Sequence, residues 1–307
     1  MVMVIYNKQS KEGSSLEKEA EMSKVTKNRY WVLRHGKSIP NERGLIVSSM
    51  ENGTRAEFQL ASDGVNQAQL AAQSFQKVPL TTSITFRYMH ALSLSLHTLD
   101  CGVLCRSING ELPFKSLHFN FNFFSICITL TLFLNTGQEL EANNIPLADV
   151  RIYYSPFSRT SHTAKVVANV VNLPFEGPHC KVIRDLRERY FGPSFELMSH
   201  DKYEEIWDID EKDPLVGPEG GESVKDVASR LARAMAIMES EFEGCAILVV
   251  SHGDPLQILQ TILHAANQHK EPATNDLASI LEAVQVAPIL SLHRKYALLT
   301  GELREVI

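Results

Sequence analysis

The 307-residue chain lacks any apolar run of the roughly 20 residues that a membrane-spanning helix needs. The apolar part of residues 123–134 is too short to cross a membrane. The six apolar residues that open the chain are too few for the core of a signal peptide. We therefore expect a cytoplasmic protein with no membrane partner.

Net positive charge is also missing. Lysine and arginine number 30 against 36 aspartates and glutamates, so the formal net charge is −6. A field of this sign repels nucleic acid, and we expect no nucleic-acid partner. If the substrate is an anion, a local cluster of positive side chains must bind it.

Cysteine is too scarce and too scattered for a disulfide framework. The chain has an odd number of cysteines, namely Cys101, Cys105, Cys127, Cys180 and Cys245. Cys101 and Cys105 are close enough in the sequence to share a metal ion, but no second ligand pair follows at zinc-site spacing. We expect a reducing compartment, no metal and no cofactor.

Residues 1–28 do not have the composition of a targeting sequence. Lysines and glutamates are mixed over residues 7–28, whereas a transit peptide is rich in arginine and poor in acidic residues. We interpret residues 1–28 as a disordered leader to a domain that spans residues 29–307.

Short apolar segments alternate with segments of helical spacing along the rest of the chain. The predicted strands are residues 30–34, 150–154 and 245–250, and the predicted helices are 62–77, 158–171 and 255–266. Ser62 or Asp63 is the expected cap of the first helix, and Ser223 with Asp226 resembles a capping box. Repeated strand, loop and helix predict a single α/β domain with a largely parallel central sheet flanked by helices.

Residues 78–138 break this alternation. They hold three of the five cysteines and follow neither a helical nor a strand period. Valine codons begin with GT, as introns do, and the glutamine codon CAG ends in AG, as introns do. The run rich in Phe, Leu, Ser and Ile before Gln138 is what a pyrimidine-rich tract encodes. We hypothesise that the segment is a retained intron or a gene-model error; a genuine apolar insertion is the alternative.

The first predicted strand ends in Arg34, His35 and Gly36. Glycine at this point allows close approach of the backbone to a ligand. A neutral imidazole can attack phosphorus when a hydrogen bond holds its other nitrogen. Taken by itself, the tripeptide is more typical of a structural histidine beside a surface arginine.

The other two predicted strands lead into Arg159 and His252. Arg159 opens a predicted helix, and a helix N-terminus with a guanidinium suits phosphate; we interpret His162, one turn later, as secondary or structural. His252 precedes Gly253 and Asp254. Because the carboxyl ends of strands carry the chemistry of α/β sheets, we expect two histidines and two arginines to converge on a tetrahedral anion.

A fourth segment, residues 186–192, contains Glu188. Its carboxyl group is a candidate proton donor to a leaving oxygen. The alternative is an ion pair of Glu188 with Arg187 or Arg189, in which case another acid, such as Glu222, becomes the candidate.

Together these motifs resemble the histidine phosphatase superfamily, and most closely its phosphoglycerate-mutase-like members from plants. The resemblance covers residues 29–77 and 139–300. It rests on the RHG signature at residues 34–36, an S-P-x-x-R context around Arg159, an L-x-E-R segment around Glu188, a strand-to-HG turn at His252, and G-E-S at residues 221–223.

The resemblance implies a two-step reaction on a small phosphorylated substrate without a metal. His35 is then the nucleophile, and Glu188 protonates the leaving alcohol and later activates water. His252 also belongs to the implied catalytic set. The implied phosphate-binding residues are Arg34, Asn41, Arg159, His252 and Gly253.

Two departures bear on the reaction. Phosphoglycerate mutases have glutamate after RHG, where this chain has Lys37, and they follow the second histidine with G-N-S, where this chain has G-D-P at residues 253–255. We therefore expect a phosphatase that acts through a phosphohistidine. A mutase and a catalytically silent phosphate-binding module are the alternatives.

Overall fold

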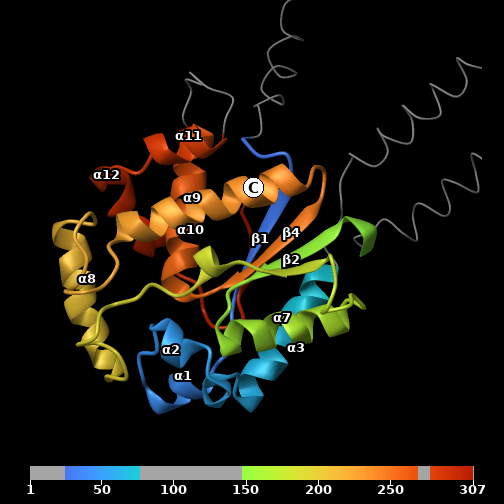
Figure 1. Ribbon diagram of the computed structural model, residues 1–307, viewed down its shortest axis with the longest axis horizontal. Coiled ribbons are helices and arrows are strands. Elements are labelled where there is room, and N and C mark those ends of the chain that lie inside the picture. The colour runs from blue at the N-terminus through green and yellow to red at the C-terminus, as the bar shows by residue number, and fades with distance from the viewer. Residues whose placement is uncertain (1–24, 77–146, 269–276, 307) are drawn as a thin grey trace, which may run out of the picture.

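The computed structural model of the chain describes residues 25–76, 147–268 and 277–306 (Figure 1). The expected leader, apart from its last four residues, and the whole of segment 78–138 lie outside the described residues. In the described ranges, no helix is both long and apolar enough to cross a membrane.

A five-stranded sheet forms the centre of the domain, in the order β3-β2-β4-β1-β5. The strands are β1 (Arg29–Arg34), β2 (Val150–Tyr154), β3 (Cys180–Val182), β4 (Ala246–Ser251) and β5 (Leu303–Glu305). Pairing is parallel between β1 and β4, β2 and β4, and β2 and β3, whereas the edge strand β5 runs antiparallel to β1. The single α/β domain with a mostly parallel sheet that the sequence predicts is therefore what the chain forms.

Helices cover both faces of the sheet, because alternate side chains of a buried strand point to opposite sides. Trp31 and Leu33 of β1 pack on the face covered by α3 (Ser62–Gln76) and α7 (Ser158–Val170). Tyr30 and Val32 pack on the other face, under α9 (Val224–Glu241) and α10 (Gly253–Gln268). Figure 1 shows these two layers. Every residue of β4 is buried, as its central place requires.

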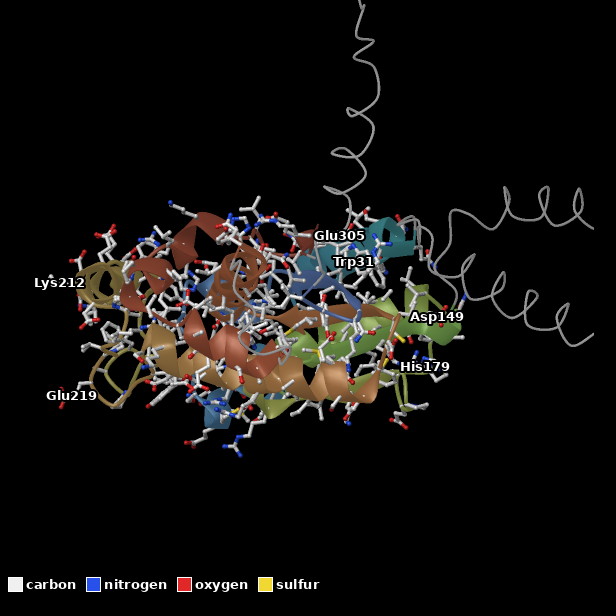
Figure 2. The ribbon with its side chains drawn as sticks, turned by 90° about the horizontal axis from the view of Figure 1, so that it is seen from above. Trp31, Asp149, His179, Lys212, Glu219 and Glu305 are labelled. Carbon is white, nitrogen blue, oxygen red and sulfur yellow. The ribbon has the colours of Figure 1, made fainter. Side chains whose placement is uncertain are left out.

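The other elements of the described residues are shorter. They are α1 (Ile39–Arg43), α2 (Met50–Gly53), α8 (Tyr203–Lys212), α11 (Leu277–Ala283), α12 (Ala287–Leu290) and five short 3-10 turns. Figure 2 shows Lys212 of α8 and Glu219 at one end of the molecule and Asp149, which precedes β2, at the other. The segments that follow β3 thus extend to the end where the parallel strands finish.

The structure also tests the expected helix caps. Ser223 and Asp226 form the predicted capping box at the start of α9. The expected cap of α3 is wrong: the first helical hydrogen bond runs from the Val65 amide to the Ala61 carbonyl, so Ser62 and Asp63 lie in the first turn. Ala61 holds this place because its own amide donates to the Lys37 carbonyl, which ties the helix start to the loop after β1.

Candidate active site

His35 and His252 leave two neighbouring strands at the same edge of the sheet. The register pairs Arg34 with Ser251, and the amide of His35 donates to the Ser251 carbonyl at 3.0 Å. The two imidazole rings lie edge to face, with centroids 5.2 Å apart. Both histidines are buried.

Gly36 allows α3 to start directly against this loop. A Cβ atom on Gly36 would lie 2.2 Å from the carbonyl oxygen of Gly64, which no side chain tolerates. The Gly36 amide donates to Thr163 Oγ1 of α7 at 3.2 Å. The glycine thus brings α3 and α7 close to the backbone that carries His35.

The hydrogen bonds of His35 define its tautomer. Nδ1 lies 2.8 Å from the Gly36 carbonyl oxygen and so must donate to it, while Nε2 accepts from Arg159 Nε at 3.1 Å. Burial, and then the charges of Arg159 and Arg34, hold the pKa of His35 well below its usual value. The imidazole is therefore neutral and presents the Nε2 lone pair to Arg159.

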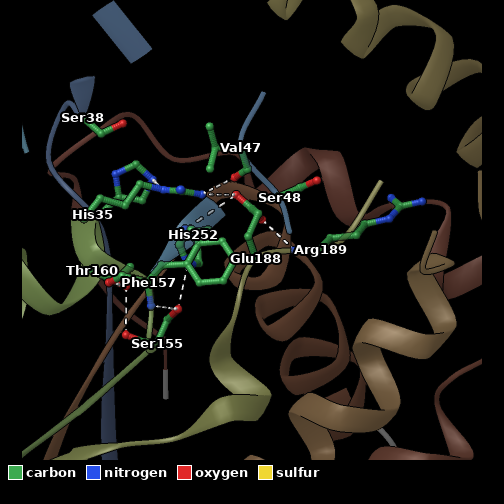
Figure 3. Close-up of polar contacts among 12 residues, drawn as sticks. His35, Ser38, Val47, Ser48, Ser155, Phe157, Thr160, Glu188, Arg189 and His252 are labelled. Carbon is green, nitrogen blue, oxygen red and sulfur yellow. Dashed lines mark hydrogen bonds and ion pairs between the residues drawn. The ribbon is translucent and has the colours of Figure 1, made fainter. Parts of the chain in front are cut away.

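Arg159 is the second residue of α7, and its guanidinium is buried at the centre of the cluster. Nη2 donates to the Val47 carbonyl at 3.0 Å and lies 3.6 Å from Glu188 Oε2. Nη1 is buried with no hydrogen-bond acceptor among the described residues. Figure 3 shows Val47, Glu188, His252 and His35 together in this cluster.

The Arg34 guanidinium is held from the C-terminal side of the chain. Nη1 donates to the Leu298 carbonyl at 2.7 Å, and Nε is buried without an acceptor in the described part of the chain. A Cβ atom on Gly253 would lie 3.5 Å from Arg34 Cζ, so the backbone at the start of α10 lies against this guanidinium.

His252 is held by a hydroxyl group and an aromatic ring. Nε2 shares a hydrogen bond of 2.8 Å with Ser155 Oγ, and the Phe157 ring lies 4.9 Å away, centroid to centroid. Nδ1 is 3.7 Å from Glu188 Oε2. Burial, and then the charge of Arg159, lower the pKa of His252 well below its usual value, so this ring is neutral too.

Glu188 lies between Arg159 and His252, and its carboxyl group is almost completely buried. Oε1 accepts from the Arg189 amide at 3.0 Å. Burial raises the pKa of Glu188 to about 7; the charge of Arg159 acts against this and that of Asp254 adds to it. A carboxyl group with this pKa exchanges its proton near neutral pH, as a general acid and base requires.

The alternative ion pairs of Glu188 with its neighbours do not form. Arg187 Nη2 pairs with Glu222 Oε1 at 2.5 Å, and Arg189 makes two hydrogen bonds of 2.7 Å to the carboxylate of Asp210. Both arginines thus point away from Glu188 and fix the backbone on either side of it.

Glu222 has the environment of a permanent carboxylate. It accepts from Arg230 Nε at 3.0 Å and from the Tyr190 amide at 3.0 Å. Burial acts to raise the pKa of Glu222, but Arg230, the Tyr190 amide and Arg187 lower it overall. Glu222 therefore stays charged and braces residues 187–190, which is not the environment of a proton donor.

Other residues singled out in the sequence lie at the margin of the cluster. Asn41 Oδ1 accepts from the amide and hydroxyl of Ser38 in the capping box of α1, and within the described residues no hydrogen bond of the Asn41 side chain reaches either histidine. Asp254 Oδ2 lies 3.4 Å from Arg189 Nη1. His162 lies on the half-buried side of α7, and burial lowers its pKa.

Sequence reasoning passed over three groups that the structure adds to the cluster. Ser155 follows β2, which is the same signal that marks His35 and His252 after their strands. The Val47 carbonyl has no side-chain signal. Tyr203 of α8 has a raised pKa through burial and then through the charge of Glu188, which puts its phenol in the field of the cluster.

The described residues contain no group of three or more histidine, cysteine, aspartate or glutamate side chains placed to hold a metal ion. Cys101 and Cys105 lie outside the described residues. The charges of Arg159 and Arg34 act on both His35 and His252.

Comparison with known proteins finds a family model that is similar to part of the chain. Residues 136–284, which include Arg159, Glu188 and His252, match the family model of the histidine phosphatase superfamily (branch 1). A search of curated proteins found no match. The expected closer likeness to plant phosphoglycerate-mutase-like proteins is not supported by these comparisons.

The fold is similar to that of several solved structures at low identity. A phosphoserine phosphatase of Entamoeba histolytica, solved with 3-phosphoglyceric acid, is 15% identical, with 90% of this chain and 88% of that chain covered and a TM-score of 0.46. A mycobacterial glucosyl-3-phosphoglycerate phosphatase is 16% identical, with 76% and 80% covered and a TM-score of 0.45. A putative α-ribazole-5′-phosphate phosphatase of Escherichia coli is 19% identical, with 77% of both chains covered and a TM-score of 0.41.

Proposed function

Because residues 136–284 match the family model of the histidine phosphatase superfamily (branch 1), we propose that the chain is a phosphatase that hydrolyses a small phosphate monoester through a phosphohistidine on His35. The observation that supports this most strongly is that a neutral, buried His35 lies in the field of two guanidinium groups, those of Arg159 and Arg34, each of which has one buried nitrogen without an acceptor in the described part of the chain.

His35 supplies the nucleophile in this proposal. Its Nδ1 proton is held by the Gly36 carbonyl, which leaves the lone pair on Nε2 for phosphorus. In the present arrangement the Nε–H of Arg159 donates to that lone pair. Arg159 must therefore exchange this hydrogen bond for one to a phosphoryl oxygen before attack, so that one guanidinium both protects the nucleophile and binds the substrate.

The charge of the transferring phosphoryl group is met by Arg34 and Arg159, with His252 beside them. Charge-assisted donors in a buried site stabilise the phosphoryl oxygens more strongly than water-exposed donors do. The guanidiniums come from the end of β1 and the start of α7, elements fixed by the sheet. The backbone at Gly253 lies against the Arg34 guanidinium at the start of α10.

Glu188 moves the protons. In the first step the bond from phosphorus to the leaving oxygen breaks as the bond to His35 Nε2 forms, and protonated Glu188 gives its proton to the leaving alkoxide. In the second step the Glu188 carboxylate takes a proton from water, whose oxygen attacks phosphorus and releases His35 and inorganic phosphate. A pKa of about 7 suits both halves.

A mutase and a silent phosphate-binding module are the competing functions. A mutase returns the phosphoryl group to another hydroxyl of its substrate. Phosphoglycerate mutases have a glutamate after RHG, but this chain has Lys37 there, which makes surface ion pairs with Asp63 and Glu42. We therefore favour hydrolysis. A silent module needs no proton donor beside its phosphate site. Glu188 lies between Arg159 and His252, and this position disfavours a silent module.

One experiment separates the three functions. The purified protein is incubated with phosphate monoesters labelled on phosphorus, including a phosphoglycerate, quenched under alkaline conditions that preserve phosphohistidine, and digested for mass spectrometry. A phosphatase releases inorganic phosphate and carries label on His35. Label that moves within the phosphoglycerate without release would establish a mutase, and binding without turnover or labelling would establish a silent module.

A further inference from the structure

The carboxylate of Glu196 accepts five hydrogen bonds from the short segment of residues 48–52. Oε2 accepts from the amide of Ser48 at 3.0 Å, from its hydroxyl at 2.7 Å and from the amide of Ser49 at 3.0 Å. Oε1 accepts from the hydroxyl of Ser49 and from Asn52 Nδ2, both at 2.8 Å. A carboxylate with this many donors fixes the loop that supplies them.

Backbone hydrogen bonds next to Glu196 also hold this segment, and together with the Glu196 carboxylate they form what we call the Glu196 clamp. The Ile46 amide donates to the Met198 carbonyl and the Leu197 amide to the Ile46 carbonyl, each at 2.8 Å. Leu197 has a φ of 62°, in the left-handed region that a leucine side chain disfavours. Its side chain is largely exposed, so packing does not compensate for this conformation. The contacts around Glu196 must therefore hold it.

Residues 47–49, which the Glu196 clamp holds, contact the active site through two atoms. The Val47 carbonyl accepts from Arg159 Nη2 at 3.0 Å, and Ser48 Oγ accepts from the Phe191 amide at 3.4 Å, close to the segment that carries Glu188. Figure 3 shows Val47 and Ser48 beside Glu188. The orientation of the Arg159 guanidinium plane thus depends on where Val47 is held.

We propose that Glu196 is a positioning residue for phosphate capture: by fixing residues 47–49 it holds the Val47 carbonyl where it orients Arg159 toward His35 and the phosphoryl oxygens. The inference rests on the proposed function only in that Arg159 binds phosphate. Hydrogen bonds from Asn52, Ser48 and Ser49 lower the pKa of Glu196 although burial acts to raise it, so the clamp is charged at neutral pH.

Binding of inorganic phosphate, measured by isothermal titration calorimetry on the full chain, tests the proposal without requiring turnover. Glu196→Ala removes the acceptor that holds residues 47–49 and should weaken phosphate binding by roughly tenfold, because a well-placed hydrogen bond from a charged group contributes about that factor or more. Glu196→Gln should weaken it less: one amide oxygen still accepts from the Ser48 and Ser49 amides, while the NH2 group can donate to the hydroxyl of Ser49.

Glu239 offers a matched control at the other end of β1. Like Glu196, it accepts several hydrogen bonds: from the Lys27 amide at 2.7 Å, from Asn28 Nδ2 at 2.9 Å and from the Tyr30 hydroxyl at 2.7 Å. Glu239→Ala should lower the melting temperature and leave phosphate binding unchanged. If Glu239→Ala weakens phosphate binding as much as the Glu196 variants do, general loosening explains the effect and the proposal fails.

A double-mutant cycle with Arg159→Lys shows whether Glu196 acts through Arg159. The lysine keeps a charge, so binding remains measurable, but it lacks the fork that the Val47 carbonyl orients. The effect of Glu196→Gln should shrink to less than about twofold in the Arg159→Lys background. Equal effects in both backgrounds, or unaltered phosphate binding in Glu196→Gln, would overturn the proposal. A wild-type protein that binds phosphate but turns over no ester would refute the proposed function and leave this test intact.

Discussion

Replacing Glu188 with glutamine should stabilise the protein in alkaline solution but much less in acid. Burial raises the pKa of this carboxyl group from 4.5 to about 7 on folding. The folded protein therefore binds the Glu188 proton more tightly than the unfolded chain does. The resulting stability is fully present below a pH of about 4.5 and is lost as the pH rises through about 7. Glutamine has no proton to lose, so its contribution does not change over this range.

The size of the effect follows from the two pKa values. A shift from 4.5 to about 7 corresponds to about 3 kcal/mol at 1.36 kcal/mol per pK unit. Most of it develops between pH 5 and pH 8. The free energy of unfolding of Glu188→Gln, taken relative to wild type, should therefore rise by about 2.5 kcal/mol between these two pH values. The comparison cancels the titration of all other groups, because both proteins share them.

Urea denaturation followed by circular dichroism at pH 5 and pH 8 measures this difference. Glu222→Gln is the matched control, because Arg230, the Tyr190 amide and Arg187 lower the pKa of Glu222 overall. A lowered pKa contributes stability above the ordinary value that is lost as the pH falls. Glu222→Gln should thus be less stable than wild type at both pH values. An equal stability difference for Glu188→Gln at pH 5 and pH 8 would show that Glu188 is an ordinary, charged carboxylate.

The remaining predictions concern the nucleophile, phosphate capture, the second histidine and the atypical segment. His35→Ala should abolish turnover and the acid-labile phosphoryl label, and full activity would refute the proposed mechanism. Arg159→Ala should weaken inhibition by inorganic phosphate or vanadate, and Arg159→Lys should restore only part of it, because a point charge lacks the planar fork; unaltered inhibition constants in both would put Arg159 outside the phosphate site. Ser155→Ala removes the partner of His252 Nε2 and should lower the free energy of unfolding by roughly 1–3 kcal/mol, measured by urea denaturation. Deleting residues 78–138 should raise soluble yield and preserve activity; a messenger RNA that exists only in the longer form, together with a deletion that unfolds the protein, would make the segment a structural element.

Much of the fold and of the cluster could be predicted from local pattern. The apolar segments before His35 and His252 are buried parallel strands, and adjacent parallel strands bring their carboxyl ends to one edge. The convergence of the two histidines with Arg34 and Arg159 therefore follows from where these residues stand relative to strands and helices. The edge strand β5 could not be found in this way, because three residues of which only one is apolar carry no strand period.

The roles of the acidic residues depended on tertiary structure. Glu188 lies between Arg187 and Arg189 in the sequence, whereas the nearest arginine to Glu222 is Arg230, a full two helical turns further on. The local sequence therefore favours an ion pair for Glu188 rather than for Glu222. Folding places Glu222 against Arg230 and Arg187, which keep it charged, and turns Arg187 and Arg189 away from Glu188. The side chain of Asn41 is used locally: its Oδ1 accepts from the Ser38 amide in a helix cap. A pKa is set by burial and by charges from distant segments, so only the tertiary structure decided which carboxyl group can keep a proton near neutral pH.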